Sequence, residues 1–307
     1  MDTLLEKYTQ LNDSFNKKKL TYRLGVEAGF FSEYNNMLLA MLYCLENKIR
    51  FKLYSKDANF KYEKGWADYF LPFCQEDSFA YQRHNPRVAV PSKKYDPRVI
   101  LHHILKPKTF LTFELWPFFR DQNREKQYFD IPELGIAGNL QDACSILVQL
   151  TWRYNEVTKK TLEEKINSLQ LPEKYIGFHI RSGDKIEEAE LFNVSQYVEK
   201  VKQYTNLRDA FLSTDDYSIV ETFRTQFKDW NIYTLCKESE RGYFQKEFEQ
   251  KDQKFMRQHH ENLFASIDIL KKSTVFVGTF SSNIGMYIGM CKQDNVISID
   301  WEKWQIR

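Results

Sequence analysis

The sequence has no long hydrophobic run. Its most apolar stretch, residues 37–45, is bracketed by Glu33 and Glu46 and has about half of the roughly 20 residues that a membrane-spanning helix needs. The opening segment, residues 1–19, alternates charged with apolar residues, so it lacks the continuous apolar core of a signal peptide. We expect a cytoplasmic protein without a transmembrane segment, for which only peripheral contact with a membrane stays open.

Cysteine is scarce and scattered. The number of cysteines is odd, and no pair has C-x-x-C spacing. The pattern therefore indicates neither a disulfide framework nor a zinc knuckle. We therefore expect a reducing compartment. The five cysteines are Cys44, Cys74, Cys144, Cys236 and Cys291.

Two motifs of cofactor enzymes are also missing. The chain contains no G-x-G-x-x-G, which argues against a dinucleotide-dependent dehydrogenase. The pairs His102-His103 and His259-His260 are adjacent and lack both the i,i+4 spacing and the companion motif of a metal site. We expect these histidines in the core or on the surface, and we expect no bound metal.

Charge of one sign is not in excess. The 44 basic and 42 acidic residues leave a formal net charge of +2, too little for the broad positive field that carries nonspecific nucleic-acid binding. A local basic pocket stays open. Hydrophobic residues at 42% and charged residues at 28% are typical of a folded globular protein.

The length of 307 residues suits two domains. In the first, a strand over residues 22–26, a loop around Gly29, a helix over 35–45 and a strand over 49–53 form a βαβ unit. Residues 57–139 are irregular and rich in proline and aromatic residues, and no element is predicted there. A helix follows over 140–154. Thr161 and Glu164 have capping-box spacing, so a further helix should begin there.

We place the domain boundary at Leu171-Pro172, which gives domains 1–170 and 171–307. The second domain alternates strand and helix patterns, with apolar stripes through Phe223 and Ile267 on two of the helices. Such alternation predicts a mostly parallel sheet covered by helices. The predicted strands are 175–180, 209–213, 231–235, 274–278 and 296–300.

The most informative motif is HIRSGDK, residues 179–185, where the first strand of the second domain ends. Ligands of open α/β sheets bind outside the carboxyl ends of the strands. The guanidinium of Arg181 suits phosphate oxygens, and His179 and Lys185 add donors. The motif therefore indicates an anionic ligand. The structural alternative is an ordinary turn in which Arg181 pairs with Asp184.

A second motif, GTFSSN at residues 278–283, joins a strand to a helix. Small hydroxyl residues at a helix start provide free N–H groups and side-chain donors, which together form a phosphate cradle. Helix capping without a ligand is equally compatible with this segment. A third motif, STDD at residues 213–216, places Asp215 and Asp216 at a strand end, where they could bind a sugar hydroxyl or cap the next helix.

Together these three motifs, in this order, resemble the GDP-fucose-dependent fucosyltransferases. The similarity is greatest to the α1,6 group, with relatives among the α1,2 and protein O-fucosyltransferases, and it covers about residues 162–289. It includes H-x-R-x-G/T-D-K at 179–185, S/T-D-D at 214–216 and T-F-S-S at 279–282. The resemblance implies an α/β fold of the GT-B class, with two Rossmann-like domains facing a cleft, the acceptor in the first and the nucleotide sugar in the second.

The resemblance also implies residue roles. Arg181 would bind the β-phosphate of the donor, His179 the nucleotide, and Thr279, Ser281 and Ser282 the phosphates. Many family members have a second arginine where this chain has Ser182. An acidic residue before the last motif contacts guanine in the α1,6 group. Asp268 is the candidate here, although Ser266 occupies the ungapped position.

The implied reaction inverts the anomeric centre without a metal, so the expected ligands are a GDP-sugar and a glycan acceptor, with no cofactor. Prepositioned cations stabilise the leaving diphosphate, and a carboxylate takes the proton of the acceptor hydroxyl. Alignment with one deletion places the family's glutamate at Glu188, followed by Glu190 and then Glu187. A solvated acidic loop is the structural alternative for this cluster.

Several functions stay open on the sequence alone. A transferase of the same fold could use another GDP- or UDP-sugar, because fold does not fix the donor. A carbohydrate-binding relative without activity is the nonenzymatic alternative, against which the intact H-x-R segment and the acidic cluster argue. The absence of a membrane anchor favours a bacterial or viral glycan-assembly enzyme over a Golgi enzyme.

Overall fold

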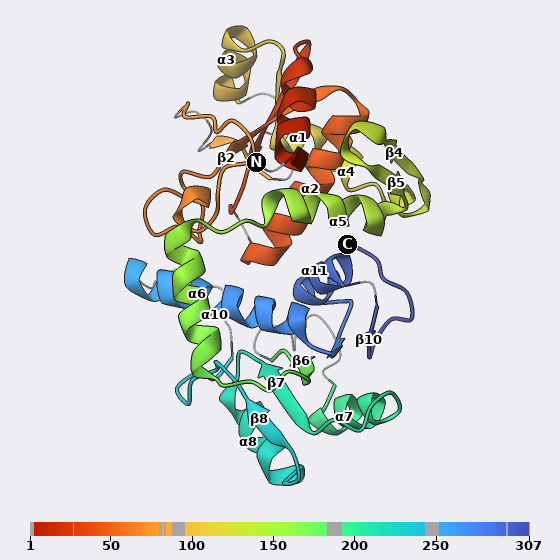
Figure 1. The fold of residues 1–307 in the computed structure, drawn as a ribbon. Helices are drawn as coiled ribbons and strands as arrows, with labels where there is room; N and C mark the ends of the chain where they lie inside the picture. The colour runs from red at the N-terminus through yellow and green to blue at the C-terminus, as the bar shows by residue number, and fades with distance from the viewer. Residues whose placement is uncertain are drawn as a thin grey trace. The chain divides into compact units, whose positions relative to one another are not determined.

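The computed structural model describes residues 3–26, 28–79, 82, 84–87, 96–182, 192–242, 252–292 and 294–306. The chain forms two compact units, and each contains a parallel β-sheet with helices (Figure 1). The first unit comprises Met1–Asn155 with Ile306–Arg307, and the second comprises Glu156–Gln305. Within the described residues, no helix is both long enough and apolar enough to cross a membrane.

The two compact units divide after Asn155, whereas the sequence placed the domain boundary after residue 170. Helix α6 (Glu156–Ser168) packs on α10 (Gln253–Lys272) and therefore belongs to the second unit. The capping-box spacing predicted that a helix begins at Thr161. Instead, Thr161 lies inside α6, and its hydroxyl donates to the main-chain oxygen of Val157 at 3.0 Å. Leu162 of this helix is buried.

The first unit is built around a three-stranded parallel sheet in the order β2-β1-β3. Strand β1 (Lys18–Arg23), helix α2 (Phe30–Glu46) and strand β2 (Ile49–Tyr54) form the predicted βαβ unit. The strand begins and ends earlier than predicted, since Gly25 has a φ of +76°, a left-handed conformation that interrupts the strand and that glycine adopts without strain.

Aromatic packing explains why the proline-rich part of the first unit could not be predicted. Trp66 stacks on Tyr34 with ring centroids 6.2 Å apart, and Phe70 stacks on Phe30 at 5.9 Å. These contacts join residues far apart in the sequence, so the elements that hold them are short. The remaining elements of this unit are α1 (Thr3–Ser14), η1 (Trp66–Asp68), α3 (Pro97–Leu105), β3 (Thr109–Leu111), α4 (Thr112–Phe119), η4 (Gln122–Lys126), β4 (Phe129–Ile131), η5 (Pro132–Leu134), β5 (Ile136–Gly138) and α5 (Leu140–Thr151).

The second unit contains a five-stranded parallel sheet in the order β10-β9-β6-β7-β8. Counted along the unit, this order is 5-4-1-2-3, the arrangement of a Rossmann sheet. All five strands were predicted, with ends that differ by at most a few residues. Their bounds are β6 (Ile176–His179), β7 (Asp209–Ser213), β8 (Asn231–Tyr233), β9 (Val275–Gly278) and β10 (Val296–Ser298).

Helices α7 (Val194–Lys202), α8 (Tyr217–Gln226), α10 and α11 (Asn283–Cys291) connect these strands. The stripe predicted through Phe223 is buried in the core with Phe178 and Trp230. Ile267 and Leu270 of α10 are also buried. These helices pack against the sheet, and this packing fixes the positions of the loops at its strand ends.

Candidate active site

The site lies where the strand order of the second unit reverses. Strand β6 pairs with β7 on one side and with β9 on the other, so the chain leaves the first strand in one direction and returns on its opposite side. Loops at such a switch point diverge and leave a crevice in which ligands of α/β proteins bind. The three sequence motifs follow these three neighbouring strands, and the fold therefore brings them to one edge of the sheet.

His179 ends strand β6 and pairs in register with Ser213 of β7. Its side chain is buried. Burial, and then the nearby positive charge of Arg181, lowers the pKa of His179 to about 3, so the imidazole is neutral at physiological pH. Its Nδ1 is buried without a hydrogen-bond partner among the described residues. A buried polar atom left in this state is an available contact for a bound ligand.

Ser182 connects the first motif to the third. Its main-chain N–H donates to Oδ1 of Asp215 at 2.9 Å. Its hydroxyl donates to Oδ2 of Asp216 at 3.3 Å. The family's second arginine is thus replaced by a residue that ties the loop after β6 to the loop after β7.

Asp216 also caps a helix, which was the structural alternative considered for this motif. Its Oδ1 accepts a 2.9 Å hydrogen bond from the main-chain N–H of Ser218 at the start of α8. The main-chain oxygen of Asp215 accepts from the N–H of Gly242 at 2.8 Å. Both aspartates of this motif are therefore engaged in contacts that hold the loops after β6 and β7.

The turn after β9 is organised by Asp300, a residue that the sequence did not single out. Its Oδ1 accepts from the N–H of Phe280 at 2.8 Å, and its Oδ2 accepts from the N–H of Ser281 at 2.9 Å. Burial alone would raise the pKa of Asp300, but hydrogen bonds from Ser281, Ser298 and Phe280 lower it. Two N–H groups expected to face phosphate are therefore already bonded to a carboxylate.

Ser282 is the N-cap of α11. Its hydroxyl accepts from the N–H of Gly285 and donates to the main-chain oxygen of Thr279, at 3.0 and 2.9 Å. A Cβ on Gly285 would lie 1.9 Å from that oxygen, so only glycine lets the helix begin this close to the turn. Capping is thus the observed role of Ser282. The side chains of Thr279 and Ser281 remain partly exposed, and phosphate contact by this turn stays a prediction.

Asp268 is not brought together with these residues. It lies in the last turns of α10, which ends at Lys272 just before β9 begins at Val275, and its carboxylate is 3.9 Å from the Nζ of Lys271. That position is nearer the amino ends of the strands than the edge that carries the motifs. Ser266 is buried on the same helix. The guanine contact therefore stays a prediction.

The acidic cluster and the end of the first motif lie outside the described residues. This applies to Asp184, Lys185, Glu187, Glu188 and Glu190. Their predicted roles in catalysis and donor binding rest on the sequence alone.

The histidine pairs have structural contacts. Nε2 of His102 lies 3.0 Å from the main-chain oxygen of Thr109, and Nδ1 of His260 lies 2.8 Å from that of Met256. Both rings are buried, which is the core position of the two that the sequence left open. In the part of the chain that the structure describes, no three histidine, cysteine, aspartate or glutamate side chains are grouped so that they could hold a metal ion.

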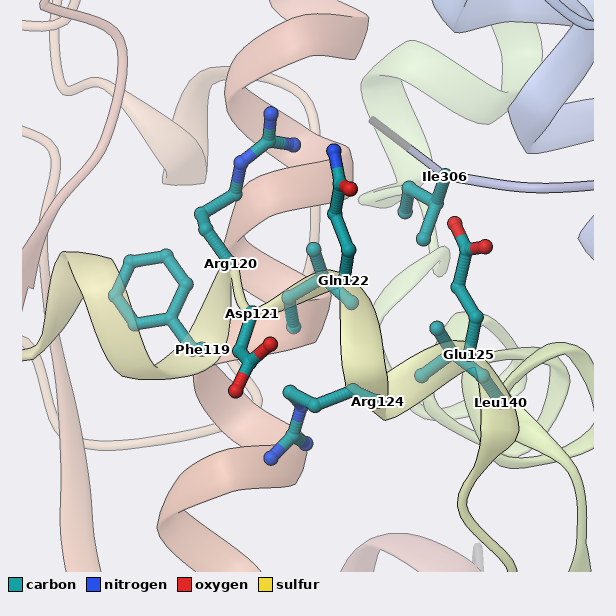
Figure 2. Close-up of a pocket in the computed structure, with 9 residues that line it drawn as sticks. Phe119, Arg120, Asp121, Gln122, Arg124, Glu125, Leu140 and Ile306 are labelled. Atoms are coloured by element: carbon teal, nitrogen blue, oxygen red, sulfur yellow. The ribbon is translucent and has the colours of Figure 1, made fainter.

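A separate pocket in the first unit is too small for a sugar. It is lined by Arg120, Gln122, Arg124 and Ile306 among others, and its volume is about 30 Å³, well below the roughly 300 Å³ at which ordinary ligand pockets begin. Figure 2 shows the side chains of Arg120 and Gln122 pointing to the same side of the η4 segment, away from Arg124. We do not assign the acceptor to this pocket.

Sequence reasoning missed Ser182 and Asp300 as organising residues. Ser182 lay inside a recognised motif, but its partner Asp215 is 33 positions away. Asp300 follows the last strand and bonds to a turn about one helix and one loop earlier. Acidic and hydroxyl residues directly after a parallel strand, as in Ser298 to Asp300, are the signal that could have found this contact.

Comparison with known proteins identifies the family to which this site is similar. The model of alpha-(1,6)-fucosyltransferase N- and catalytic domains matches residues 143–287. No curated protein sequence matches the chain.

Solved structures of similar fold include three fucosyltransferases. NodZ from Bradyrhizobium has a TM-score of 0.53 and 12% identity, over 93% of this chain and 96% of that chain. POFUT1 in complex with GDP-fucose has a TM-score of 0.51 and 13% identity, over 92% and 97%. A variant of Arabidopsis thaliana FUT1 in complex with GDP has a TM-score of 0.54 and 11% identity, over 94% and 71%.

At these identities the solved structures show the fold, and the family model adds a match that contains all three motifs. The fold class and the resemblance predicted from the sequence are confirmed. The chain thus has the GT-B fold of these fucosyltransferases, and residues 143–287 are similar to the alpha-(1,6)-fucosyltransferase family.

Proposed function

We propose that this chain is an inverting fucosyltransferase that transfers L-fucose from GDP-fucose to a hydroxyl group of a glycan. The observation that carries the proposal is the convergence of the three motifs at the switch point between β6 and β9. The family match over residues 143–287 supports fucose transfer, and the similar POFUT1 and FUT1 structures are complexes with GDP-fucose and GDP.

Donor binding rests on Arg181 and His179 in this proposal. Arg181 follows β6 at the switch point, where its guanidinium would bind the diphosphate through paired N–H donors. The neutral imidazole of His179, with its unpartnered Nδ1, would contact the nucleotide. The hydrogen bonds of Ser182 to Asp215 and Asp216 hold the loop that carries Arg181.

The reaction needs stabilisation of charge at both ends. As the bond between the anomeric carbon and the diphosphate breaks, negative charge grows on the phosphate oxygens, and Arg181 is the described residue suited to stabilise it. The acceptor oxygen forms its new bond on the opposite face of the sugar and transfers its proton to a carboxylate. We assign that carboxylate to Glu188, with Glu190 as the second choice.

No cofactor is part of the proposal, since the leaving group would be neutralised by side chains. The acceptor would bind the first unit. Its sugar and linkage are not specified by any described contact, and they are questions for acceptor screening.

The test measures donor binding and turnover together. Thermal unfolding should shift upward more with GDP than with the same concentration of UDP or CDP, because a ligand stabilises the state that binds it. GDP release from GDP-fucose in the presence of a glycan mixture should continue in EDTA, and NMR of the product should show the inverted anomeric configuration. Equal shifts with GDP and UDP would contradict the donor, and loss of turnover in EDTA would contradict metal independence.

A further inference from the structure

Helix α3 (Pro97–Leu105) turns its apolar side to solvent. Figure 1 shows it at the periphery of the first unit. Successive helical residues are rotated by roughly 100°, so its apolar residues form one continuous stripe that includes Pro97. A surface helix ordinarily has the opposite polarity. The exposed fractions are 50% for Ile100, 51% for Leu101, 70% for Ile104 and 59% for Leu105.

The opposite side of α3 holds it in this orientation. Val99 and His102 are buried, and His102 contacts the main-chain oxygen of Thr109 in β3 at 3.0 Å. Nε2 of His103 lies 3.1 Å from Oε1 of Glu114. The helix could not turn its apolar stripe inward without breaking these contacts, so the stripe is a fixed feature of the surface.

Lysines adjoin the stripe at the C-terminal end of α3. Lys108 follows Leu105 by three residues, and its main-chain oxygen accepts from the N–H of Lys19 at 2.8 Å, which places the start of β1 beside it. Lys17, Lys18 and Lys108 are exposed and have no acidic side chain within 4 Å among the described residues. We call Lys17, Lys18, Lys19, Lys106 and Lys108 the basic rim.

Further basic residues lie in the sheet next to the basic rim. Lys19 is paired in register with Arg50, and Thr21 with Lys52. Burial lowers the pKa of Lys52, Asp77 opposes this, and Lys19, Arg50 and Lys106 lower it further. Lys106 is 3.3 Å from Asp77 and lies over the ring of Phe79, so a cation and an exposed aromatic ring extend the stripe.

We propose that the apolar stripe of α3 and the basic rim form a docking surface for an anionic lipid bilayer. Isoleucine and leucine side chains of an interfacial helix insert at the boundary of headgroups and acyl chains, while lysines remain at the level of the phosphates. Each lysine near such a surface adds to the attraction. The stripe and the rim are adjacent, as this mode of binding requires.

The basic rim also argues against a second copy of the chain as the occupant. A symmetric dimer through α3 would use the same patch on both copies, and α3 itself has no acidic residue that could face the basic rim of the other copy. An anionic bilayer has the complementary charge. The proposal concerns the first unit alone and does not depend on the proposed donor or reaction.

The experiment is cosedimentation of the full chain with sucrose-loaded vesicles. Vesicles of phosphatidylcholine with phosphatidylglycerol should bind the protein at least about 10-fold more tightly than vesicles of phosphatidylcholine alone, and about 0.5 M salt should reduce this binding, because screening weakens surface electrostatics. Equal binding to both vesicles, or none to either, overturns the proposal.

Two double variants separate the contributions of the stripe and the rim. Ile100→Ser/Ile104→Ser should weaken binding to anionic vesicles at least about 10-fold, since it removes the exposed apolar anchor. Lys18→Gln/Lys108→Gln should weaken it and reduce its salt dependence. Val157→Ser/Tyr204→Ser is the matched control for exposed apolar residues, one in α6 and one just after α7. Lys159→Gln/Lys160→Gln, in α6, is the matched control for exposed lysines.

Controls that bind like wild type while both test variants bind weakly support the proposal. Test variants that bind like wild type overturn it. Sedimentation velocity on the same samples provides a further check. If wild type forms a dimer that Ile100→Ser/Ile104→Ser dissociates, and binds no anionic vesicle, then α3 is a self-association surface and the proposal is wrong.

Discussion

The main-chain N–H of Ser182 donates a 2.9 Å hydrogen bond to Oδ1 of Asp215. This contact joins the loop that carries Arg181 to the loop after the neighbouring strand. A loop that is held in the unbound protein loses less conformational entropy on binding a ligand. Asp215 is therefore a positioning residue for Arg181 in the proposed donor site.

Replacing Asp215 should weaken donor binding when the substitution removes the side-chain oxygen that accepts from the Ser182 N–H. Asp215→Ala removes the partner of the Ser182 N–H, and we expect the Kd for GDP to rise about 10-fold, which corresponds to roughly 1.4 kcal/mol. Asp215→Asn keeps an oxygen at that position and should bind within about threefold of wild type. Calorimetric titration measures both, with Asp229→Ala, an exposed aspartate, as the control. Equal affinities for the alanine and asparagine variants would disprove the hydrogen-bonding role.

Arg181 should not tolerate the conservative change to lysine. An ammonium group retains the charge but cannot provide the planar, paired donors that a guanidinium offers to phosphate. We expect Arg181→Lys to lower kcat by about 100-fold or more, the usual effect of removing one preorganised donor at a developing charge. Arg181→Ala should in addition weaken GDP binding. GDP-release assays near wild-type rates for the lysine variant would show that Arg181 lies outside the reacting groups.

The second unit was predictable because its strands are short apolar runs that end in turn residues. The strand at Asp209–Ser213 has the bounds that its pattern indicated. The first unit was less readable because β3 has three residues and α4 contains Pro117. Such elements are held by packing between distant residues, and local sequence patterns do not encode this packing. Helix α3 was also hard to predict, because its apolar side is exposed, whereas a surface helix ordinarily buries its apolar side.

The same distinction applies to the site. Each motif could be recognised because it is local and follows a strand. The bonds of Ser182 to Asp215 and of Asp300 to Phe280 join different loops, so they depended on the strand order. That order, with β6 between β7 and β9, is a property of the whole sheet. Capping by Ser282 and Asp216 was among the alternatives that the sequence left open, and the structure shows both caps.

Asp300 should stabilise the turn after β9. Asp300→Ala removes the acceptor of the Ser281 N–H and leaves the Phe280 N–H only its 3.2 Å bond to the Ser298 hydroxyl. A buried donor without a partner costs about 1–3 kcal/mol. We expect the melting temperature to fall by several degrees, measured by differential scanning calorimetry. Asp294→Asn, an exposed position nearby in sequence, is the control and should leave it unchanged. Equal melting temperatures for Asp300→Ala and Asp294→Asn would show that the turn does not depend on Asp300.

Stability should decrease on mild acidification because burial lowers the pKa of several histidines, among them His102, His179 and His260. Burial lowers the pKa of His179 to about 3 and that of His260 to about 4, whereas the unfolded values are near 6.5. Between these values the unfolded chain binds more protons, so the free energy of unfolding falls as pH falls from about 6.5. Each histidine contributes at most about 1.4 kcal/mol per pH unit. The stabilising effect is complete above about pH 6.5.

Urea unfolding at pH 7.5, 6.0 and 5.0 measures this dependence. His179→Gln should lower stability at every pH but flatten the slope by about one proton, because the variant has no group to titrate there. His84→Gln, at an exposed position, should retain the wild-type slope. If the wild-type and His179→Gln slopes agree, then His179 is not buried in the neutral form.

The general base is predicted to be Glu188, on the sequence alone. The family's glutamate follows the first motif, and one deletion aligns it with Glu188. Glu188→Gln is nearly isosteric, so the variant should fold and bind GDP like wild type. Its turnover should fall by about 100-fold or more, the usual contribution of a positioned base. Measured side by side, Glu190→Gln and Glu187→Gln should retain more activity.

The pH profile separates a base from a residue that only orients the acceptor. With a general base, the wild-type kcat rises with pH through the pKa of the carboxyl group, and this limb should disappear in Glu188→Gln because the variant has no group to deprotonate. An orienting residue would lower kcat while leaving the limb in place. If Glu190→Gln loses the limb and Glu188→Gln keeps it, the base is Glu190. If all three glutamine variants keep it, the proton acceptor lies elsewhere in the chain.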